Sequence, residues 1–257
     1  MALAVCALVA VTCIEFELPI SFEVLGYIFF GSITGYNFVK YAPAAGLHHR
    51  SLAPHLKAIQ LFSFLCFGIV GYFVFQMPAK VLYLSCIFGI LTFLYAIPFL
   101  KKKNLRTLSG LKIFVVAVVW AGMTVLIPYV YTKTYLSLEV WWSFVQRGLI
   151  VIVLTLPFEI RDLRYDLIGL RTIPQQIGIR NTKVLGIVLL VVALALEFAK
   201  APLNEIHLMS LGLMVVITAA ALKASGKRQS LYYASFWVES LPIGWWAGLI
   251  TLKALFG

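Results

Sequence analysis

Residues 148–178 read GLIVIVLTLPFEIRDLRYDLIGLRTIPQQIG, an apolar run that passes directly into a cluster of acidic residues. Glu159, Asp162 and Asp166 occupy positions i, i+3 and i+7, which lie on one face of a helix. Carboxylates that share a helix face repel one another unless a cation lies between them. Mg²⁺ takes oxygen ligands and is often shared between protein carboxylates and substrate phosphates. The stretch therefore favours a magnesium and phosphate site at the end of an apolar helix.

Three arginines, Arg161, Arg164 and Arg171, are interleaved with these acids. A guanidinium group binds either a carboxylate or a phosphate through paired hydrogen bonds, so the arginines have two interpretations. They neutralise the acids in a solvated, salt-bridged helix end, or they meet the phosphate oxygens of a substrate. The charge pattern alone leaves both interpretations open.

The composition places the whole chain in a membrane. Of its 257 residues, 62% are hydrophobic, and the mean hydropathy is +0.96. Soluble domains have about 45–50% apolar residues, so we expect a polytopic membrane protein that forms one integral domain over residues 1–257. The net charge of +11 comes from basic residues on short loops between apolar runs. These residues are typical of topology determinants that attract anionic lipid or phosphate, and they do not indicate a nucleic-acid partner.

Apolar runs of spanning length recur along the chain. A transmembrane helix needs about 20 mostly apolar residues. This criterion predicts an all-α bundle of about nine transmembrane helices, at residues 2–17, 22–41, 55–75, 79–99, 111–130, 141–160, 182–200, 205–223 and 234–254.

Loop charges orient this bundle. The loops after the second, fourth, sixth and eighth spans hold 16 of the 21 Lys and Arg residues. Because basic loops stay in the cytoplasm, the acidic face of Glu159 is expected on the cytoplasmic side. With an odd number of spans, the N-terminus is then inside and the C-terminus outside. We expect the host membrane to be a bacterial inner membrane.

Charges inside the spans are rare. Arg147 lies one or two turns into the sixth span, where a charge facing lipid is costly, and we expect it to snorkel to the outer interface. The sequence shows no charges at the bundle centre and no pair of broken helices, both of which mark transporters. A small-molecule transporter therefore has less support.

The segment after the sixth span resembles a motif of the UbiA superfamily of intramembrane prenyltransferases. That superfamily also has nine spans and a D-x-x-x-D followed by G-x-x-T-I-P in this position. The stretch YAIPFLKKKNL, residues 95–105, resembles the loop after the fourth span of the family. The residues that match the motif are Asp162, Asp166, Gly169, Thr172, Pro174 and Gly178, with Glu159 three positions ahead.

The resemblance implies a reaction and a set of roles. Asp162 and Asp166, assisted by Glu159, would be catalytic residues and ligands of Mg²⁺, which would hold the diphosphate of an isoprenyl donor. The metal neutralises charge on the leaving diphosphate. The bundle shields the allylic cation from water until an acceptor, often an aromatic ring, attacks it. The implied partners are an isoprenyl diphosphate, a lipophilic acceptor and membrane lipid.

A first acidic motif, expected after the second span, departs from the family pattern. Asn37 fits the leading asparagine of Asn-Asp-x-x-Asp-x-x-x-Asp, but Phe38, Tyr41 and Ala45 stand where that pattern has aspartates. One metal site has therefore lost its carboxylates. We expect other polar and basic groups to bind substrate near the diphosphate, namely Asn37, Lys40, Arg50, Lys101, Arg164 and Arg171.

Two functions remain open from the sequence. The first is a UbiA-like prenyltransferase that works with the second acidic motif and Mg²⁺. The alternative is a catalytically inactive protein of the same fold that binds an isoprenoid or quinone-type lipid. The altered first motif favours the alternative, whereas the intact carboxylates after the sixth span favour the enzyme.

Overall fold

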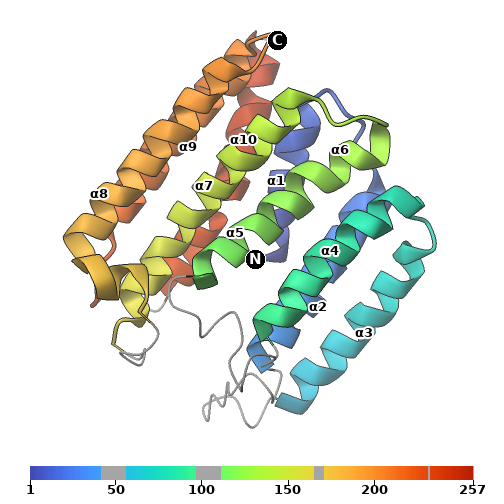
Figure 1. The fold of residues 1–257 in the computed structure, drawn as a ribbon, viewed down its shortest axis with the longest axis horizontal. Helices are drawn as coiled ribbons and strands as arrows, with labels where there is room; N and C mark the ends of the chain where they lie inside the picture. The colour runs from blue at the N-terminus through green and yellow to red at the C-terminus, as the bar shows by residue number, and fades with distance from the viewer. Residues whose placement is uncertain (42–55, 97–110, 165–170, 231, 257) are drawn as a thin grey trace.

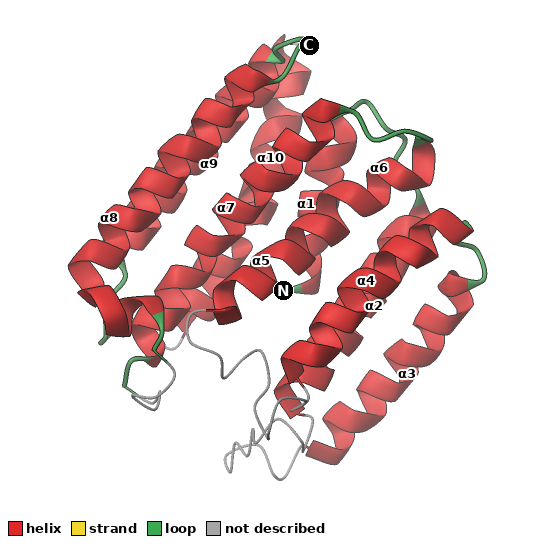
Figure 2. Cartoon of the chain, in the orientation of Figure 1, coloured by secondary structure: helices red, strands yellow, loops and turns green. Residues whose placement is uncertain are grey.

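The computed structural model describes residues 1–41, 56–96, 111–164, 171–230 and 232–256. Within these ranges the chain is helical and contains no strand (Figure 2), which confirms the predicted all-α class. The elements are α1 (Ala2–Glu15), α2 (Phe22–Tyr41), α3 (Leu56–Val74), α4 (Ala79–Ala96), α5 (Leu111–Ala121), the π-helical turn η4 (Gly122–Leu126), α6 (Ile127–Thr132), α7 (Leu138–Asp162), α8 (Ile173–Ala195), the 3-10 turn η6 (Leu196–Ala199), α9 (Glu205–Ala224), the π-helical segment η7 (Tyr233–Val238) and α10 (Glu239–Phe256).

Each predicted span coincides with a helical segment in the described ranges. Six helical stretches are long and apolar enough to cross a membrane: Lys57–Val74, Ala79–Ala96, Leu111–Thr132, Leu138–Asp162, Ile173–Ala199 and Glu205–Ala224. The shorter α1 is also apolar, and α2 and α10 complete the bundle. The chain is therefore an integral membrane protein of the predicted kind.

One boundary differs from the prediction. The seventh span was predicted from residue 182, whereas α8 begins at Ile173. Thr172 is the N-cap, and the Gln175 side chain accepts a hydrogen bond from the Thr172 backbone N–H at 3.1 Å. Pro174 suits the first turn of a helix because no intrahelical partner is needed there for its missing N–H. A kink at Gly178, with φ of 77°, joins this polar first turn to the apolar part of α8. Hydropathy finds only the apolar part.

The bundle has two apolar cores that share α1 and α7. The first lies between α1, α5, α7, α8, α9 and α10, and the second between α1, α2, α4, α6, η4 and α7. The central helices α1, α5, α6 and α7 thus separate the pair α8–α9 from the group α2–α4 (Figure 1).

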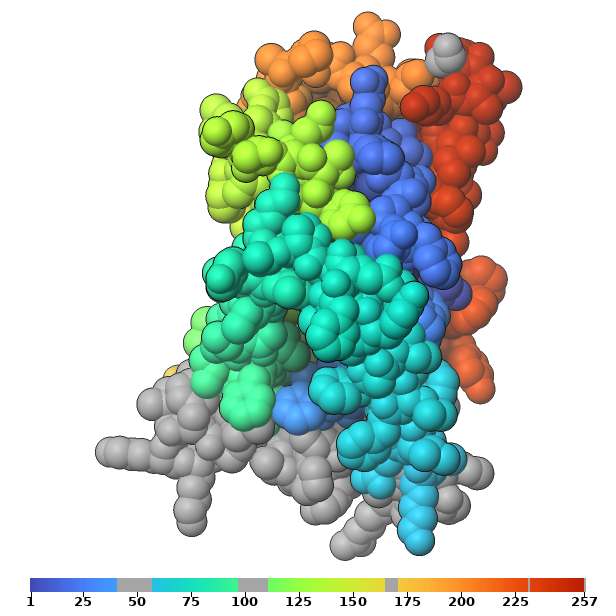
Figure 3. Space-filling view, turned by 90° about the vertical axis from the view of Figure 1, so that its right-hand side faces the viewer, coloured from blue at the N-terminus to red at the C-terminus, as the bar shows by residue number. Residues whose placement is uncertain are grey.

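The outer side of α3 and α4 carries large apolar side chains (Figure 3). Phe64 and Phe75 of this face are 73% and 92% exposed, which is expected for a surface in contact with lipid. Other members of this exposed set are Leu61, Phe62, Leu65, Phe67, Tyr72, Tyr83, Ile87 and Ile90.

The helix ends fall into two groups. Helices α2, α4, α7 and α9 finish at one end of the bundle, where α3, α5 and α8 begin (Figure 1). We call this the basic end, because the sequence between these helices is rich in Lys and Arg. The C-termini of α1, α6, η6 and α10 lie at the opposite end.

Candidate functional site

Glu159 and Asp162 stand on the last turn of α7, at the basic end. Glu159 is buried, with its side chain 5% exposed, and its Oε1 lies 3.2 Å from Nζ of Lys112 at the start of α5. The carboxylate is thus held toward the interior by a neighbouring cation, which offsets the cost of burying its charge.

Asp162 is more open than Glu159. Its Oδ1 accepts a hydrogen bond from Nε of Arg161 at 2.8 Å, and its side chain is 29% exposed. The guanidinium group of Arg161 also lies over the ring of Phe158, 5.3 Å from its centroid. The predicted pairing of these arginines with acids is present at this position, and a partly exposed carboxylate remains at the helix end.

The end of α7 is anchored by a residue that sequence reasoning missed. Pro157 stands inside the helix, and its carbonyl accepts a hydrogen bond from Nε2 of Gln229 at 2.9 Å. The Oε1 of Gln229 accepts from the Gly226 backbone N–H, so one side chain ties α7 to the segment after α9. No local pattern signals this contact, because it joins residues that are 72 positions apart in the sequence.

The predicted substrate residues of α2 are engaged locally. Nδ2 of Asn37 donates to Oγ of Ser63 on α3 at 2.7 Å, and Nζ of Lys40 lies 5.4 Å from the centroid of the Tyr36 ring. Phe38, which replaces an acid of the resembled motif, stacks on Phe93 of α4 with the ring planes 9° apart and the centroids 6.2 Å apart. An aromatic contact between α2 and α4 therefore stands where the family pattern has a metal ligand.

The remaining predicted residues flank the acids or lie elsewhere. Arg164 and Arg171 are exposed on either side of residues 165–170, and the Arg171 carbonyl accepts from Nε2 of Gln176 at 2.6 Å. The ends of α2 and α7 and the start of α8 lie at the basic end (Figure 1). Five predicted positions lie outside the described residues: Ala45, Arg50, Lys101, Asp166 and Gly169. The Tyr41 side chain is also outside them.

The oxygen donors at the end of α7 suit a hard cation. Mg²⁺ usually takes one or two protein carboxylates and completes its shell with water and substrate phosphate. Glu159 and Asp162 supply two carboxylates one turn apart, and Asp162 retains partial exposure. The ion pairs with Lys112 and Arg161 are compatible with this use, because a phosphate arriving with the metal offers these cations new partners.

A second polar group was missed by sequence reasoning. Arg147 is buried, 2% exposed, and does not reach the outer interface as predicted. Its guanidinium donates to the Leu8 carbonyl at 2.8 Å and to Oγ1 of Thr12 at 3.2 Å, both on α1. Buried charges near it at the opposite end of the bundle are Glu15, Glu197 and Lys200, with His207 beside them. The prediction that Arg147 snorkels to the outer interface is therefore wrong.

The comparisons with known proteins agree with the architecture. No protein-family model matches the chain, and no curated sequence matches it. The chain is similar to the apo structure of a UbiA homolog from Aeropyrum pernix K1, with a TM-score of 0.72 and 15% sequence identity. The match covers 97% of this chain and 97% of that one. The chain therefore has a UbiA-like fold, and an identity this low shows the fold alone.

Proposed function

We propose that the protein is a prenyltransferase, which transfers an isoprenyl group from a diphosphate donor to a lipophilic acceptor. The observation that carries the proposal is the UbiA-like fold over 97% of the chain, with Glu159 and Asp162 at one helix end beside exposed arginines. A carboxylate pair next to basic groups is the arrangement that holds a metal-bound diphosphate.

Acidic and basic residues have different roles in this proposal. Asp162 and Asp166, with Glu159, hold Mg²⁺, which neutralises the charge that develops on the leaving diphosphate. Arg164 and Arg171 flank these acids and bind the phosphate oxygens. Lys40, in the last turn of α2, contributes a further positive charge at the basic end.

The altered first motif changes how the part of the site near α2 binds the donor. Because Phe38, Tyr41 and Ala45 replace acids, the donor is held through one carboxylate-bound metal site and by basic side chains. The stacked rings of Phe38 and Phe93 are 38% and 51% exposed and offer an apolar surface to the isoprenyl chain or to the acceptor. The lipophilic reactants enter from the surrounding lipid.

The orientation follows from the loop charges. The basic end faces the cytoplasm, where water-soluble diphosphates and Mg²⁺ are available, and the opposite end faces outward. The membrane is a bacterial inner membrane.

A thermal-unfolding experiment tests the metal role of the acids. The detergent-purified protein is heated with inorganic diphosphate, with Mg²⁺ or with EDTA, as wild type and as Asp162→Asn. We expect Mg²⁺ to raise the Tm of the wild type and not that of the variant, because binding to the folded state stabilises it. Glu139→Gln, a change of an acid in the first turn of the same helix, is the matched control and should keep the Mg²⁺ effect.

The opposite outcome is equally clear. If Asp162 only pairs with Arg161, Asp162→Asn lowers the Tm equally with and without Mg²⁺. Such a result would remove the metal site and, with it, the proposed reaction.

A further inference from the structure

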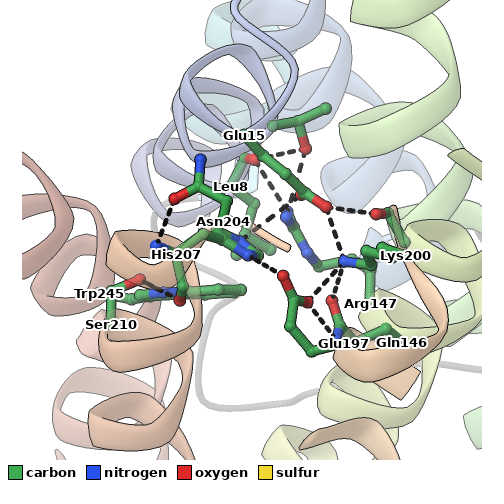
Figure 4. A network of polar contacts seen from close by, with 12 residues as sticks. Leu8, Glu15, Gln146, Arg147, Glu197, Lys200, Asn204, His207, Ser210 and Trp245 are labelled. Carbon is green, nitrogen blue, oxygen red and sulfur yellow. Dashed lines mark hydrogen bonds and ion pairs between the residues drawn. The ribbon is translucent and has the colours of Figure 1, made fainter. Parts of the chain in front are cut away.

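The buried polar cluster at the opposite end of the bundle joins four segments of the chain (Figure 4). Glu15 comes from the end of α1, Gln146 from α7, and His207 from the first turn of α9. Glu197 belongs to η6, and Lys200 follows it. The Glu15, Glu197, Lys200 and His207 side chains are 1–7% exposed. The cluster is therefore part of the interior and far along the bundle from Glu159.

Most polar atoms of this cluster have partners. Nζ of Lys200 donates to Oε1 of Glu15 at 2.7 Å, to Oε2 of Glu197 at 2.7 Å and to Oε1 of Gln146 at 2.9 Å. Oγ of Ser143 donates to the same oxygen of Glu15. One oxygen of each glutamate is thus used in binding the lysine.

His207 is oriented by the other oxygen of Glu197. Its Nδ1 lies 2.8 Å from Oε1 of that carboxylate, so Nδ1 carries the proton and donates it. In the neutral imidazole, the lone pair of Nε2 points away from Glu197 and toward Glu15 of α1. Nε2 of His207 and Oε2 of Glu15 are buried, have no hydrogen-bond partner and lie 3.6 Å apart.

This distance distinguishes the groups that fit between the two atoms. It is too long for a direct hydrogen bond. A bridging water, with two hydrogen bonds of about 2.8 Å at a near-tetrahedral angle, needs about 4.5 Å between its partners. A transition-metal ion with bonds of about 2.0–2.1 Å spans 3.6 Å at an angle of about 120°.

We propose that this cluster is a binding site for a transition-metal ion of the zinc class. Nε2 of His207 and Oε2 of Glu15 are the protein ligands, and Glu197 orients the imidazole through its Nδ1–H. A carboxylate in this second position is the usual partner of a metal-bound histidine. One ligand atom from each of Glu15, Glu197 and His207 lies within 4.8 Å of the others. The ion ties α1 to α9.

Charge sets the strength of this site. The carboxylates of Glu15 and Glu197 balance Lys200 and Arg147 when His207 is neutral, so a divalent ion adds positive charge to a neutral interior. Lys200 opposes the ion directly, because its Nζ holds oxygens of both glutamates. Removing its charge must therefore strengthen metal binding, although it removes three hydrogen bonds of the native cluster.

The experiment is a Zn²⁺ titration of the full chain in detergent after treatment with EDTA. The chain has four histidines, and three of them, His48, His49 and His55, lie outside the described residues. Changing all three to glutamine gives a background in which His207 is the only imidazole. We expect His207→Gln and Glu15→Gln in this background to bind one Zn²⁺ fewer than the background itself, and Glu139→Gln to bind the same number.

Lys200→Met supplies the sharpest result. In the same background it is expected to lower the Kd for Zn²⁺ by at least about tenfold, because a like charge leaves a low-dielectric site. If Lys200 only makes hydrogen bonds within the cluster, Lys200→Met is less stable than the background and its Kd for Zn²⁺ does not fall.

Variants of the cluster can fail to fold, so a further measurement uses a protein in which the cluster is unchanged. X-ray absorption at the zinc edge of the triple-glutamine protein should show oxygen and nitrogen ligands at about 2.0–2.1 Å with one imidazole. The proposal is overturned if this protein binds no Zn²⁺, if His207→Gln binds it equally, or if the spectrum contains no imidazole. These outcomes leave the proposed reaction at the basic end untouched, since Glu15 and His207 have no part in it.

Discussion

Replacing Arg147 with methionine is expected to lower the free energy of unfolding by about 3 kcal/mol. The guanidinium makes two hydrogen bonds to α1, at 2.8 Å to the Leu8 carbonyl and 3.2 Å to Oγ1 of Thr12, and lies 5.0 Å from the centroid of the Trp245 ring. Hydrogen bonds of charged groups contribute about 1.5–3 kcal/mol each, and a desolvated cation–π contact up to about 2 kcal/mol. The apolar area of the new methionine offsets part of this sum, whereas the loss of the guanidinium leaves one carboxylate charge of the cluster unbalanced. The net loss is about 3 kcal/mol, at the lower end of the range found when one partner of a buried ion pair is removed.

Equilibrium unfolding in a detergent titration measures this loss. Lys253→Met, a change of an exposed base near the same end of the bundle, is the control and should stay within about 0.5 kcal/mol of the wild type. If Arg147→Met is as stable as this control, the arginine reaches the lipid interface as the sequence predicts, and the buried cluster is wrongly described.

Two glycine pairs test the packing and the backbone. A Cβ at Gly122 would lie 2.0 Å from Cζ of the buried Phe88, so Gly122→Ala should cost about 1–2 kcal/mol in unfolding experiments. Gly148→Ala, whose Cβ meets its nearest neighbour at 3.9 Å, should be neutral or stabilising, and equal stability of the two variants would contradict the packing. Gly178→Ala should cost about 1–2 kcal/mol because φ is 77° there. Gly212→Ala in α9, where a Cβ meets nothing within 4 Å, should gain up to about 1 kcal/mol, so a gain at Gly178 would refute the kink.

Much of the fold was predictable because hydropathy reports lipid exposure directly. The predicted 22–41 and 205–223 spans coincide with α2 and α9 to within one residue, since both helices end where the apolar run ends. The prediction failed at the start of α8, where a polar turn capped at Thr172 precedes the apolar part. A cap is a backbone hydrogen-bonding feature, and average hydropathy does not detect it.

The site at the basic end was predictable as a set of residues but not as a set of contacts. The spacing of Glu159 and Asp162 indicated a shared helix face, and the interleaved arginines indicated ion pairs. Pairing of Asp162 with Arg161 follows from adjacency, whereas pairing of Glu159 with Lys112 depends on the packing of α5 against α7. That packing is a tertiary feature that no local pattern contains.

The buried cluster at the opposite end was missed for the same reason. Glu15, Arg147, Glu197 and Lys200 are separated by up to 185 positions, and each lies near the end of an apolar run. Taken singly, such residues indicate an interface with water. Only their convergence from α1, α7 and η6 shows that they neutralise one another in the interior.

The central claim is that the acids at the end of α7 bind an isoprenyl diphosphate through Mg²⁺. Isothermal titration of the detergent-purified protein with geranylgeranyl diphosphate, in Mg²⁺ and in EDTA, tests it most directly. Binding that requires Mg²⁺ and disappears in Asp162→Asn, but persists in Glu139→Gln, is the predicted result. Absence of binding in both conditions would contradict the donor site for this diphosphate and leave a UbiA-like protein that binds lipid without diphosphate chemistry.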